Sequence, residues 1–375
     1  MSDSVPLPAP VPAKAPAKTS WVRILILAVM LVAIAGGVYA VIYYSNQDTG
    51  TVDSGKLLKE YLAQQSKNAK LADGYTDADK DLIADPPANG PLQNPNEIVF
   101  CVVGADDPVK AEAMWKPLME AIAAKTGKKV VYLQDPPPPP REDGEPAPLV
   151  GVAYETQLEE LRNGKLFVTA FSTGQVTGAV NTAGFVPLFC PADAQGNFTY
   201  EMEVIVPADS PLKSPADLKG QRVAFSSLSS NSGGKAPLVT FKKDFGLLPG
   251  RDYEFTLTGD HKRTIKEVCE KKHPAGCVAN DILQQMTNSG EVKADQYKSI
   301  YKSAKFPPLC FGVPHNLDKT LRTKIEAAFS EFTFAGNSVG ERYKSQNRTK
   351  FARVNFEADW KDVREIDAQL VKLLD

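Results

Sequence analysis

The stretch Ser214 to Gly234 constrains the fold more than any other part of the chain, because it contains a short helix, a strand and a second helix start in immediate succession. A serine followed by Pro215 is a favourable helix start: serine caps the free N–H groups of the first turn, and proline supplies a helical φ. Gly220 is expected to end this helix. Arg222–Phe225 then forms a predicted buried strand.

The segment that follows this strand is rich in hydroxyl groups. Ser226–Ser232 contains five serines and one asparagine, and Gly233 and Gly234 come next. If 235–245 is the next helix, the serine-rich segment lies at its N-terminus, where free backbone N–H groups and the helix dipole favour an anion. The alternative interpretation is a loop that only caps the helix.

Strands and helices alternate along the rest of the chain. Strands are predicted at 97–103, 129–133, 166–171, 200–206, 255–260, 277–279 and 299–303, and helices at 108–125, 154–162, 263–271, 318–332 and 359–374. This order implies right-handed parallel units. Two crossings, near 206–210 and 299–307, predict a two-lobed α/β protein with lobe 1 at 97–205 and 304–375 and lobe 2 at 206–303. Ligands of open α/β sheets bind beyond the carboxyl ends of the strands.

An apolar segment near the N-terminus, residues 21–44, has the length of a transmembrane helix. A cleaved signal peptide is the alternative, with small residues at 33–37 as its cleavage region. The flanking charges are Lys14, Lys18 and Arg23 before the segment and Asp48 and Asp53 after it. The positive-inside rule therefore predicts a single-pass anchor with a cytoplasmic N-terminus and a periplasmic or otherwise extracytoplasmic body.

Three further segments have a composition that sets them apart from the two lobes. Residues 1–20 are rich in Pro, Ala and Lys and predict a disordered cytoplasmic tail. Residues 45–96 are interpreted as an extracytoplasmic linker that contains one possible helix, 55–72. The polyproline segment at 135–148 is expected to be an inserted surface loop.

Composition and motifs exclude several classes of function. A net charge of −2 and the lack of a basic reading helix argue against a nucleic-acid partner. The five cysteines form no C-x-x-C pair, so neither a metal site nor a cofactor is expected. The sequence has no G-x-S-x-G, P-loop or H-E-x-x-H motif and only three histidines, so no catalytic residues and no enzymatic activity are expected.

Four short motifs are similar to those of a known family. They are Asp106-Asp107-Pro108, Gly164-Lys165, Ser230-Asn231-Ser232-Gly233 and Gly259-Asp260-His261. Together with DLKGQRVAF they resemble the PhnD-like phosphate-, phosphite- and phosphonate-binding proteins of ABC importers, from about residue 97 to the C-terminus. The resemblance implies a periplasmic-binding-protein type 2 fold, a small oxyanion as ligand and an ABC permease as partner.

The resemblance also identifies departures from the family pattern. Ala105 and Val176 occupy positions where related phosphonate binders have tyrosines, and Ala279 occupies the position of a ligand-facing aspartate. Each lost hydrogen bond is worth about 0.5–1.5 kcal/mol. The sequence therefore supports the fold more strongly than the ligand.

The predicted ligand-binding residues come from both lobes. Lobe 2 contributes the serine-rich loop and a histidine, and lobe 1 contributes polar residues after a predicted strand; the set is Ser230, Asn231, Ser232, Gly233, His261, Ser172, Thr173 and Gln175. The alternative for each lobe 1 residue is that its side chain only satisfies backbone groups. For His261 we expect a contact with the acidic ligand that strengthens when the ring is protonated; a solvated loop residue is the alternative.

These features predict a membrane-anchored solute-binding protein that closes two lobes around a small anion and delivers it to the permease by hinge motion. The alternative is a sensory or scaffold ectodomain of the same fold whose cleft has lost its ligand. In an oxidising compartment we expect a disulfide between Cys269 and Cys277, with Cys101–Cys310 as the competing pair.

Overall fold

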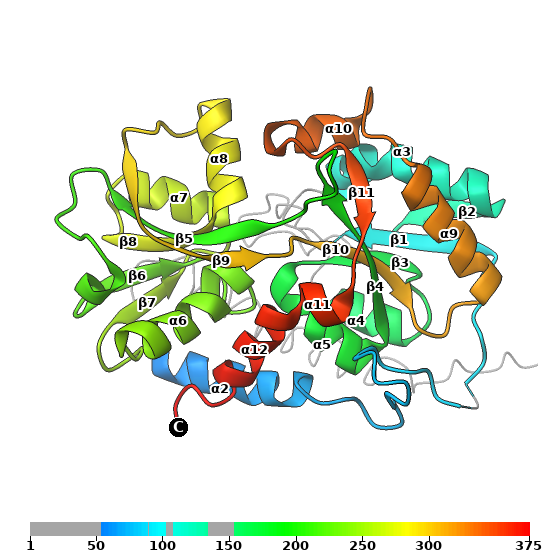
Figure 1. The fold of residues 1–375 in the computed structure, drawn as a ribbon, viewed down its shortest axis with the longest axis horizontal. Helices are drawn as coiled ribbons and strands as arrows, with labels where there is room; N and C mark the ends of the chain where they lie inside the picture. The colour runs from blue at the N-terminus through cyan, green and yellow to red at the C-terminus, as the bar shows by residue number, and fades with distance from the viewer. Residues whose placement is uncertain (1–53, 89, 103–107, 134–153) are drawn as a thin grey trace, which may run out of the picture. The chain divides into compact units, whose positions relative to one another are not determined.

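Two β-sheets organise the part of the chain that the structure describes (Figure 1). The structure is a computed structural model, which describes residues 54–88, 90–102, 108–133 and 154–375. All of these belong to one compact unit, Asp53–Asp375. The predicted tail and anchor, 1–44, and the polyproline insert, 135–148, lie outside the described residues. Among the described helices, none is both long and apolar enough to cross a bilayer.

The first sheet has the strand order β11-β4-β10-β3-β1-β2. Its strands are β1 (Glu97–Val102), β2 (Lys129–Tyr132), β3 (Val168–Phe171), β4 (Phe185–Ala192), β10 (Cys310–Pro314) and β11 (Lys350–Arg353). The β-α-β order makes β1, β2 and β3 parallel, whereas β10 runs antiparallel to both β3 and β4. The helices of this lobe are α3 (Pro108–Thr126), α4 (Tyr154–Arg162), α5 (Thr173–Ala183), α9 (Lys319–Glu331) and α10 (Ser338–Tyr343).

The second sheet has the strand order β7-β6-β8-β5-β9. Its strands are β5 (Tyr200–Pro207), β6 (Arg222–Phe225), β7 (Glu254–Leu257), β8 (Ala275–Ala279) and β9 (Tyr297–Phe306), and its helices are α6 (Ala236–Phe245), α7 (His261–Cys269) and α8 (Asn280–Ser289). The two crossing strands, β5 and β9, pair with each other from Tyr200↔Phe306 to Pro207↔Tyr297. The two-lobed α/β prediction is confirmed, but the sheet connectivity puts both crossings a few residues outside the predicted 206–303 boundaries.

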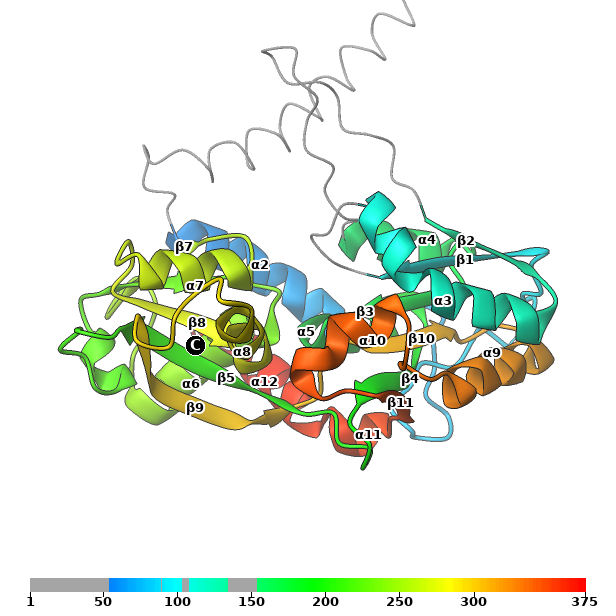
Figure 2. The same cartoon turned by 90° about the horizontal axis from the view of Figure 1, so that it is seen from above.

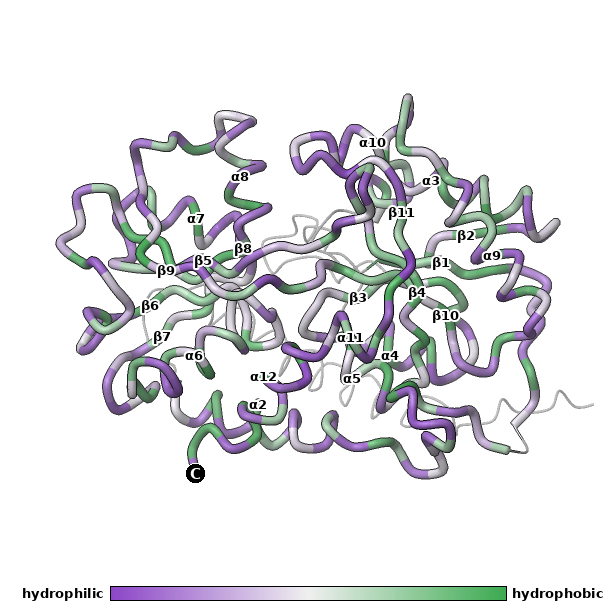
Figure 3. The backbone as a smooth tube through the Cα atoms, viewed as in Figure 1, coloured by the Kyte–Doolittle hydropathy of each residue, from purple (hydrophilic) through white to green (hydrophobic). Residues whose placement is uncertain are grey.

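Aromatic packing fills both lobes. In the first, Phe100, Trp115 and Phe311 form a buried ring cluster. In the second, Phe225 stacks on Phe255 on the face that α6 covers. Strands such as β1 are correspondingly apolar along their length in Figure 3. These cores fix the ends of the strands, which is where the polar residues of the site lie.

One predicted loop is a helix. Residues 172–177 were expected to end the second strand of lobe 1, but β3 ends at Phe171 and α5 begins at Thr173. The helix ends at Gly184, which has a φ of 64°. A Cβ there would collide with the ring of His315, so glycine is required by both backbone conformation and space.

The predicted linker 45–96 contains a helix that packs on the lobes. Helix α2 (Ser54–Asn68) buries Leu58 and Leu62 in the core of the second lobe, and Ser54 Oγ donates to Glu254 at 2.6 Å. Its other end meets the first lobe, where Asn181 Nδ2 donates to the carbonyl of Asn68 at 3.0 Å. Helix α2 therefore contacts both lobes, and Figure 2 shows it running from β7 toward α5.

The C-terminal helix also departs from the predicted assignment to lobe 1. The single helix expected at 359–374 is divided at Trp360 into α11 (Phe356–Asp359) and α12 (Lys361–Leu370). Leu370 and Leu373 pack in the second-lobe core beside the leucines of α2. Burying these apolar side chains stabilises the C-terminal segment against lobe 2, not lobe 1.

The predicted disulfides do not form, since all five cysteines are buried and free. Adjacent residues of a strand point to opposite faces, so Cys277 packs in the core on the α6 side while Val278 shares the other core with Cys269. Cys101 and Cys310 lie in β1 and β10, with β3 between them. Two strand spacings, about 10 Å, exceed the reach of a disulfide.

Replacing Leu58, which is 1% exposed, tests whether α2 is part of the folded body. We expect Leu58→Ala to lower the free energy of unfolding by about 2–5 kcal/mol, because it leaves a cavity in the second-lobe core. The matched control is Lys59→Ala, a change at an exposed position of the same helix. Denaturant unfolding of both variants measures the difference; equal stabilities would show that α2 is only a linker.

Candidate functional site

A cavity of about 190 Å³ lies between the two lobes. Polar groups line it from the start of α5, the start of β5, the serine-rich loop, α8 and the segment before β11. The lining residues are Ser172, Thr173, Tyr200, Ser230, Asn231, Ser232, His261, Ala279, Asp281, Ile282, Gln285, Pro308, Leu309, Arg342, Tyr343, Gln346 and Arg348. The structure thus brings the serine-rich loop together with first-lobe residues, as the sequence predicts.

The serine-rich loop begins a helix, as expected. Residues Asn231–Lys235 form a π-helical turn (η2) that continues into α6, and Ser230 is its N-cap. Ser230 Oγ accepts a hydrogen bond from the backbone N–H of Gly233 at 3.1 Å. A Cβ at residue 233 would overlap Ser226 Oγ, so glycine lets the turn close on the strand before it. Gly233 therefore shapes the loop and does not line the cavity.

Asn231 provides unused hydrogen-bonding capacity in the cavity. Its side chain is 2% exposed, and within the described residues neither its Oδ1 nor its Nδ2 has a hydrogen-bond partner. A buried amide without partners costs about 1–3 kcal/mol. This penalty is relieved when a ligand supplies both a donor and an acceptor, or when water does.

Tyr200 and Ser232 complete this wall. Burial raises the pKa of Tyr200, and the side chains of Ser232, Thr173 and Asn231 beside its hydroxyl oppose the rise. The tyrosine is the first residue of β5, directly after the crossing from lobe 1. Its hydroxyl supplies an aromatic O–H in a cleft whose two family tyrosine positions are Ala105 and Val176. Val176 itself is buried in the first-lobe core and does not reach the cavity.

His261 is neutral in this arrangement. Its Nδ1 accepts a hydrogen bond from the backbone N–H of Ala279 at 3.2 Å, so the ring hydrogen lies on Nε2, 3.1 Å from Ser230 Oγ. Burial lowers the pKa of His261 to about 4. The expected strengthening by a protonated ring does not fit this geometry, because protonation would place a second N–H against the Ala279 donor.

The histidine instead orients Ser230. The hydroxyl oxygen accepts from both Gly233 N–H and His261 Nε2–H, so its own hydrogen is left to donate elsewhere. Because Ser230 lines the cavity, a ligand oxygen there is a suitable acceptor. The neutral histidine thus makes the serine a donor toward the cleft.

The first-lobe residues divide into two groups. Ser172 and Thr173 line the cavity, but Thr173 Oγ1 donates to the carbonyl of Pro307 at 2.7 Å and Ser172 Oγ donates to Gln175 Oε1 at 2.8 Å. Gln175 caps the start of α5 and does not line the cavity. Its predicted ligand contact is therefore not supported, because the helix turns the side chain back onto Ser172.

The sequence analysis missed the charged residues of the cleft. Arg348 is 6% exposed; its Nη1 donates to the Pro191 carbonyl at 2.7 Å, and its Nη2 lies 3.7 Å from Asp281 Oδ2 in the opposite lobe. Burial raises the pKa of Asp281, and Arg348 opposes the rise. Only their shared position in space identifies these two residues, since nearly seventy positions of chain separate them.

Lys235 fixes the loop from behind. Its ammonium group, 2% exposed as a residue, donates to the carbonyl of Gly174 at 2.6 Å and to Asp367 Oδ1 at 2.7 Å. The lysine follows the serine-rich loop of lobe 2, Gly174 begins α5 of lobe 1, and Asp367 lies in α12. A single buried charge therefore holds three segments together.

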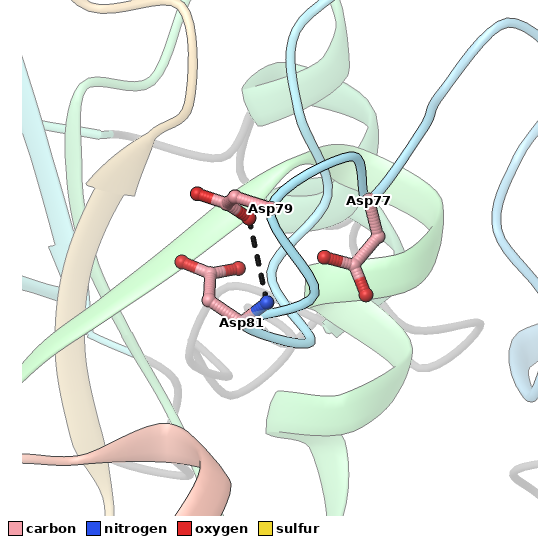
Figure 4. Close-up of side chains that lie close together, drawn as sticks. All are labelled: Asp77, Asp79 and Asp81. Carbon is pink, nitrogen blue, oxygen red and sulfur yellow. Dashed lines mark hydrogen bonds between the residues drawn. The ribbon is translucent and has the colours of Figure 1, made fainter.

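An acidic loop lies away from the cavity. Asp77, Asp79 and Asp81 place carboxylate oxygens within 4.8 Å of one another, and Asp81 N–H donates to Asp79 Oδ1 at 3.3 Å (Figure 4). Burial is the largest cause of the raised pKa of Asp81, followed by opposing and reinforcing smaller effects that include its acidic neighbours. This D-x-D-x-D pattern is visible in the sequence, and the sequence analysis did not use it.

The fold and the site together define a class. Two α/β lobes, linked by paired crossing strands, enclose a polar cavity whose donors come from both sides, which is the arrangement of a solute-binding protein.

The family follows from direct comparison. A family model described as "ABC transporter, phosphonate, periplasmic substrate-binding protein" matches residues 146–360, more than half of the chain. The chain belongs to this family, and the resemblance found in the sequence is confirmed. This is a family of solute-binding proteins.

Solved structures agree on the fold. PhnD1 from Prochlorococcus marinus, in complex with methylphosphonate, is 15% identical with a TM-score of 0.59, covering 74% of this chain and 100% of that one. A binding-protein component of an ABC phosphonate transporter from Pseudomonas aeruginosa is 17% identical with a TM-score of 0.55, covering 75% and 97%. XAC2383 from Xanthomonas citri, bound to chloride, is 16% identical with a TM-score of 0.58, covering 74% and 99%. At these identities the likeness shows the fold alone.

The neutral His261 predicts a pH dependence of stability. Its pKa is about 4 in the folded state against 6.5 ordinarily, so the unfolded state binds more protons in between. Stability therefore falls as pH falls from about 6.5 to 4, by about 2–3 kcal/mol from this residue. His261→Gln should lose that part of the decline in denaturant titrations at a series of pH values. Parallel curves for the two proteins would contradict the assignment.

The Lys235–Asp367 pair predicts an asymmetric response to substitution. Asp367→Leu leaves an uncompensated buried ammonium group and should lower the free energy of unfolding by about 3–5 kcal/mol. The double variant Lys235→Met/Asp367→Leu removes both charges and should recover most of this loss. Denaturant unfolding of the two variants decides the matter, and a double variant as unstable as the single one would show that packing, not charge, holds the segments.

Proposed function

We propose that this protein captures a small oxyanion of the phosphate, phosphite or phosphonate type between its two lobes and delivers it to an ABC permease. The cavity of about 190 Å³ is below the range usual for drug-sized ligands, about 300–1,000 Å³, and so favours a small molecule. One of the structures of the same fold contains methylphosphonate, a ligand of this class.

The observation that carries this proposal is the set of unused donors at the serine-rich loop. Ser230 has a hydroxyl hydrogen that its two neighbours do not accept, Asn231 has a free amide, and both lie at the start of η2 and α6. Helix starts favour negative charge, and hydrogen bonds to a charged oxygen are about twice as strong as neutral ones. These groups are arranged for an oxyanion.

The charged residues of the opposite wall support the same ligand class. Arg342 and Arg348 line the cavity, and Asp281 is their acidic neighbour. Because burial raises the pKa of Asp281, its carboxylate repels an anion less than an exposed aspartate would. An oxyanion that attracts both lobes also provides a driving force for closure, since it binds the closed state better than the open one.

We further propose that residues 21–44 anchor the body to the membrane with the N-terminus in the cytoplasm. Support comes from the length of this apolar segment and from the basic residues before it. The family is described as periplasmic, in agreement with an extracytoplasmic body.

Removing hydroxyls from the serine-rich loop tests the site. The double variant Ser230→Ala/Ser232→Ala should raise the dissociation constant by at least about two orders of magnitude, because each lost charge-assisted hydrogen bond is worth about 1.5–3 kcal/mol. Calorimetric titration with inorganic phosphate, phosphite and methylphosphonate measures the change. Ser229→Ala is the matched control, since Ser229 neighbours the loop without lining the cavity.

Two outcomes would count against the proposal. An oxyanion affinity that survives the double substitution would show that the loop only caps α6. If the wild-type protein binds none of the three anions, nor sulfate or an alkylsulfonate, the alternative of a sensory or scaffold ectodomain with a degenerate cleft gains the support that the lost family contacts at Ala105 and Ala279 already suggest.

A further inference from the structure

Two buried cysteines face each other across the first sheet. Cys190 lies in β4 and Cys310 in β10, and these strands pair antiparallel with Phe189 opposite Phe311. In that register Cys190 and Cys310 are directly opposite, and opposed residues of antiparallel strands point to the same face of the sheet. Both are fully buried. The sequence analysis paired neither residue with the other.

The spacing of these two positions suits a disulfide. Opposed residues in an antiparallel pair have Cα atoms about 4.5–5.5 Å apart, within the range of about 4.4–6.8 Å that disulfides require. The two thiols are also in contact: a hydrogen bond with Cys310 adds to burial in raising the pKa of Cys190. The pairs expected from sequence, Cys269–Cys277 and Cys101–Cys310, lack such an arrangement.

We propose that Cys190 and Cys310 form a disulfide when the protein folds in its extracytoplasmic compartment. The thiolate of one cysteine attacks a disulfide donor of that compartment and releases one donor thiol. The thiolate of the other cysteine then attacks the mixed disulfide and releases the second donor thiol. Two electrons pass from the cysteine pair to the donor, and each cysteine gives up one proton. Because both sulfurs are buried in the finished fold, the exchange takes place before the first-lobe core closes.

The place of this bond in the chain gives it a structural role. Cys190 precedes the first crossing and Cys310 follows the second, so the whole second sheet, from Tyr200 to Phe306, lies between them. The bond closes a loop of roughly 120 residues and joins the two chain segments of the first lobe from which the second lobe extends. Long loops gain most from such a cross-link, because it restricts the unfolded chain.

The bond also lies directly behind the cleft. The residue after Cys190 is Pro191, whose carbonyl holds Arg348, and the residue before Cys310 is Leu309, which lines the cavity. Joining the two cysteines fixes this wall of the first lobe. The inference concerns covalent chemistry of the first lobe and does not rest on which anion binds.

Thiol mapping of the full chain tests the proposal. The protein is exported to an oxidising compartment, denatured in an alkylating agent without reductant, and digested. We expect alkylated Cys101, Cys269 and Cys277, and a peptide pair linked through Cys190 and Cys310 that separates on reduction. Alkylation of all five cysteines, or a linked pair of different composition, would overturn the proposal.

Thermal unfolding gives a second, independent measurement. After refolding with reductant, the wild-type Tm should be lower by roughly 5–10 °C than after refolding without it. The Cys190→Ala/Cys310→Ala variant should be insensitive to reductant, whereas Cys101→Ala, the matched buried control, should respond like the wild type. A wild-type Tm that reductant does not change would contradict the proposal. The mapping on wild-type protein stands even if the double variant fails to fold.

Discussion

The buried ammonium group of Lys235 is the interaction on which the arrangement of the site depends. It leaves the serine-rich loop of lobe 2, donates to the first turn of α5 in lobe 1, and pairs with Asp367 of α12. A charge this deeply buried is stable only when its partners are in place. The loop, the start of α5 and the C-terminal helix therefore take up their positions together, and the donors of the cleft follow from that.

The cleft is built from neutral donors close to the loop and from charges farther away. His261 accepts from Ala279 N–H and keeps its remaining hydrogen for Ser230, which in turn has a hydrogen left for a ligand. Arg348 approaches from the other lobe, balanced by Asp281. Such a division lets a few backbone and hydroxyl groups fix the position of an oxyanion while the arginines contribute attraction over a longer range.

Two helices at the ends of the described chain make the lobes less independent than the two sheets suggest. Helix α2 contacts the second-lobe core through Leu58 and the first lobe through Asn68, and α12 packs beside it. Elements that contact both sides of a hinge limit how far it opens without breaking contacts. The fold is thus a two-lobed binding protein with a helical layer that joins its lobes.

The sequence by itself determined the alternation of strands and helices, the strand at Arg222–Phe225 and the serine-rich start of α6, because periodicity, caps and glycines act between near neighbours in the chain. It also identified Ser230, Asn231 and Ser232 as residues of the cleft. Only the tertiary structure decided that Gln175 caps a helix, that His261 is neutral, that Arg348 meets Asp281 and that Cys190 faces Cys310. These depend on strand register, side-chain direction and burial, which bring distant residues together and leave no local pattern in the sequence.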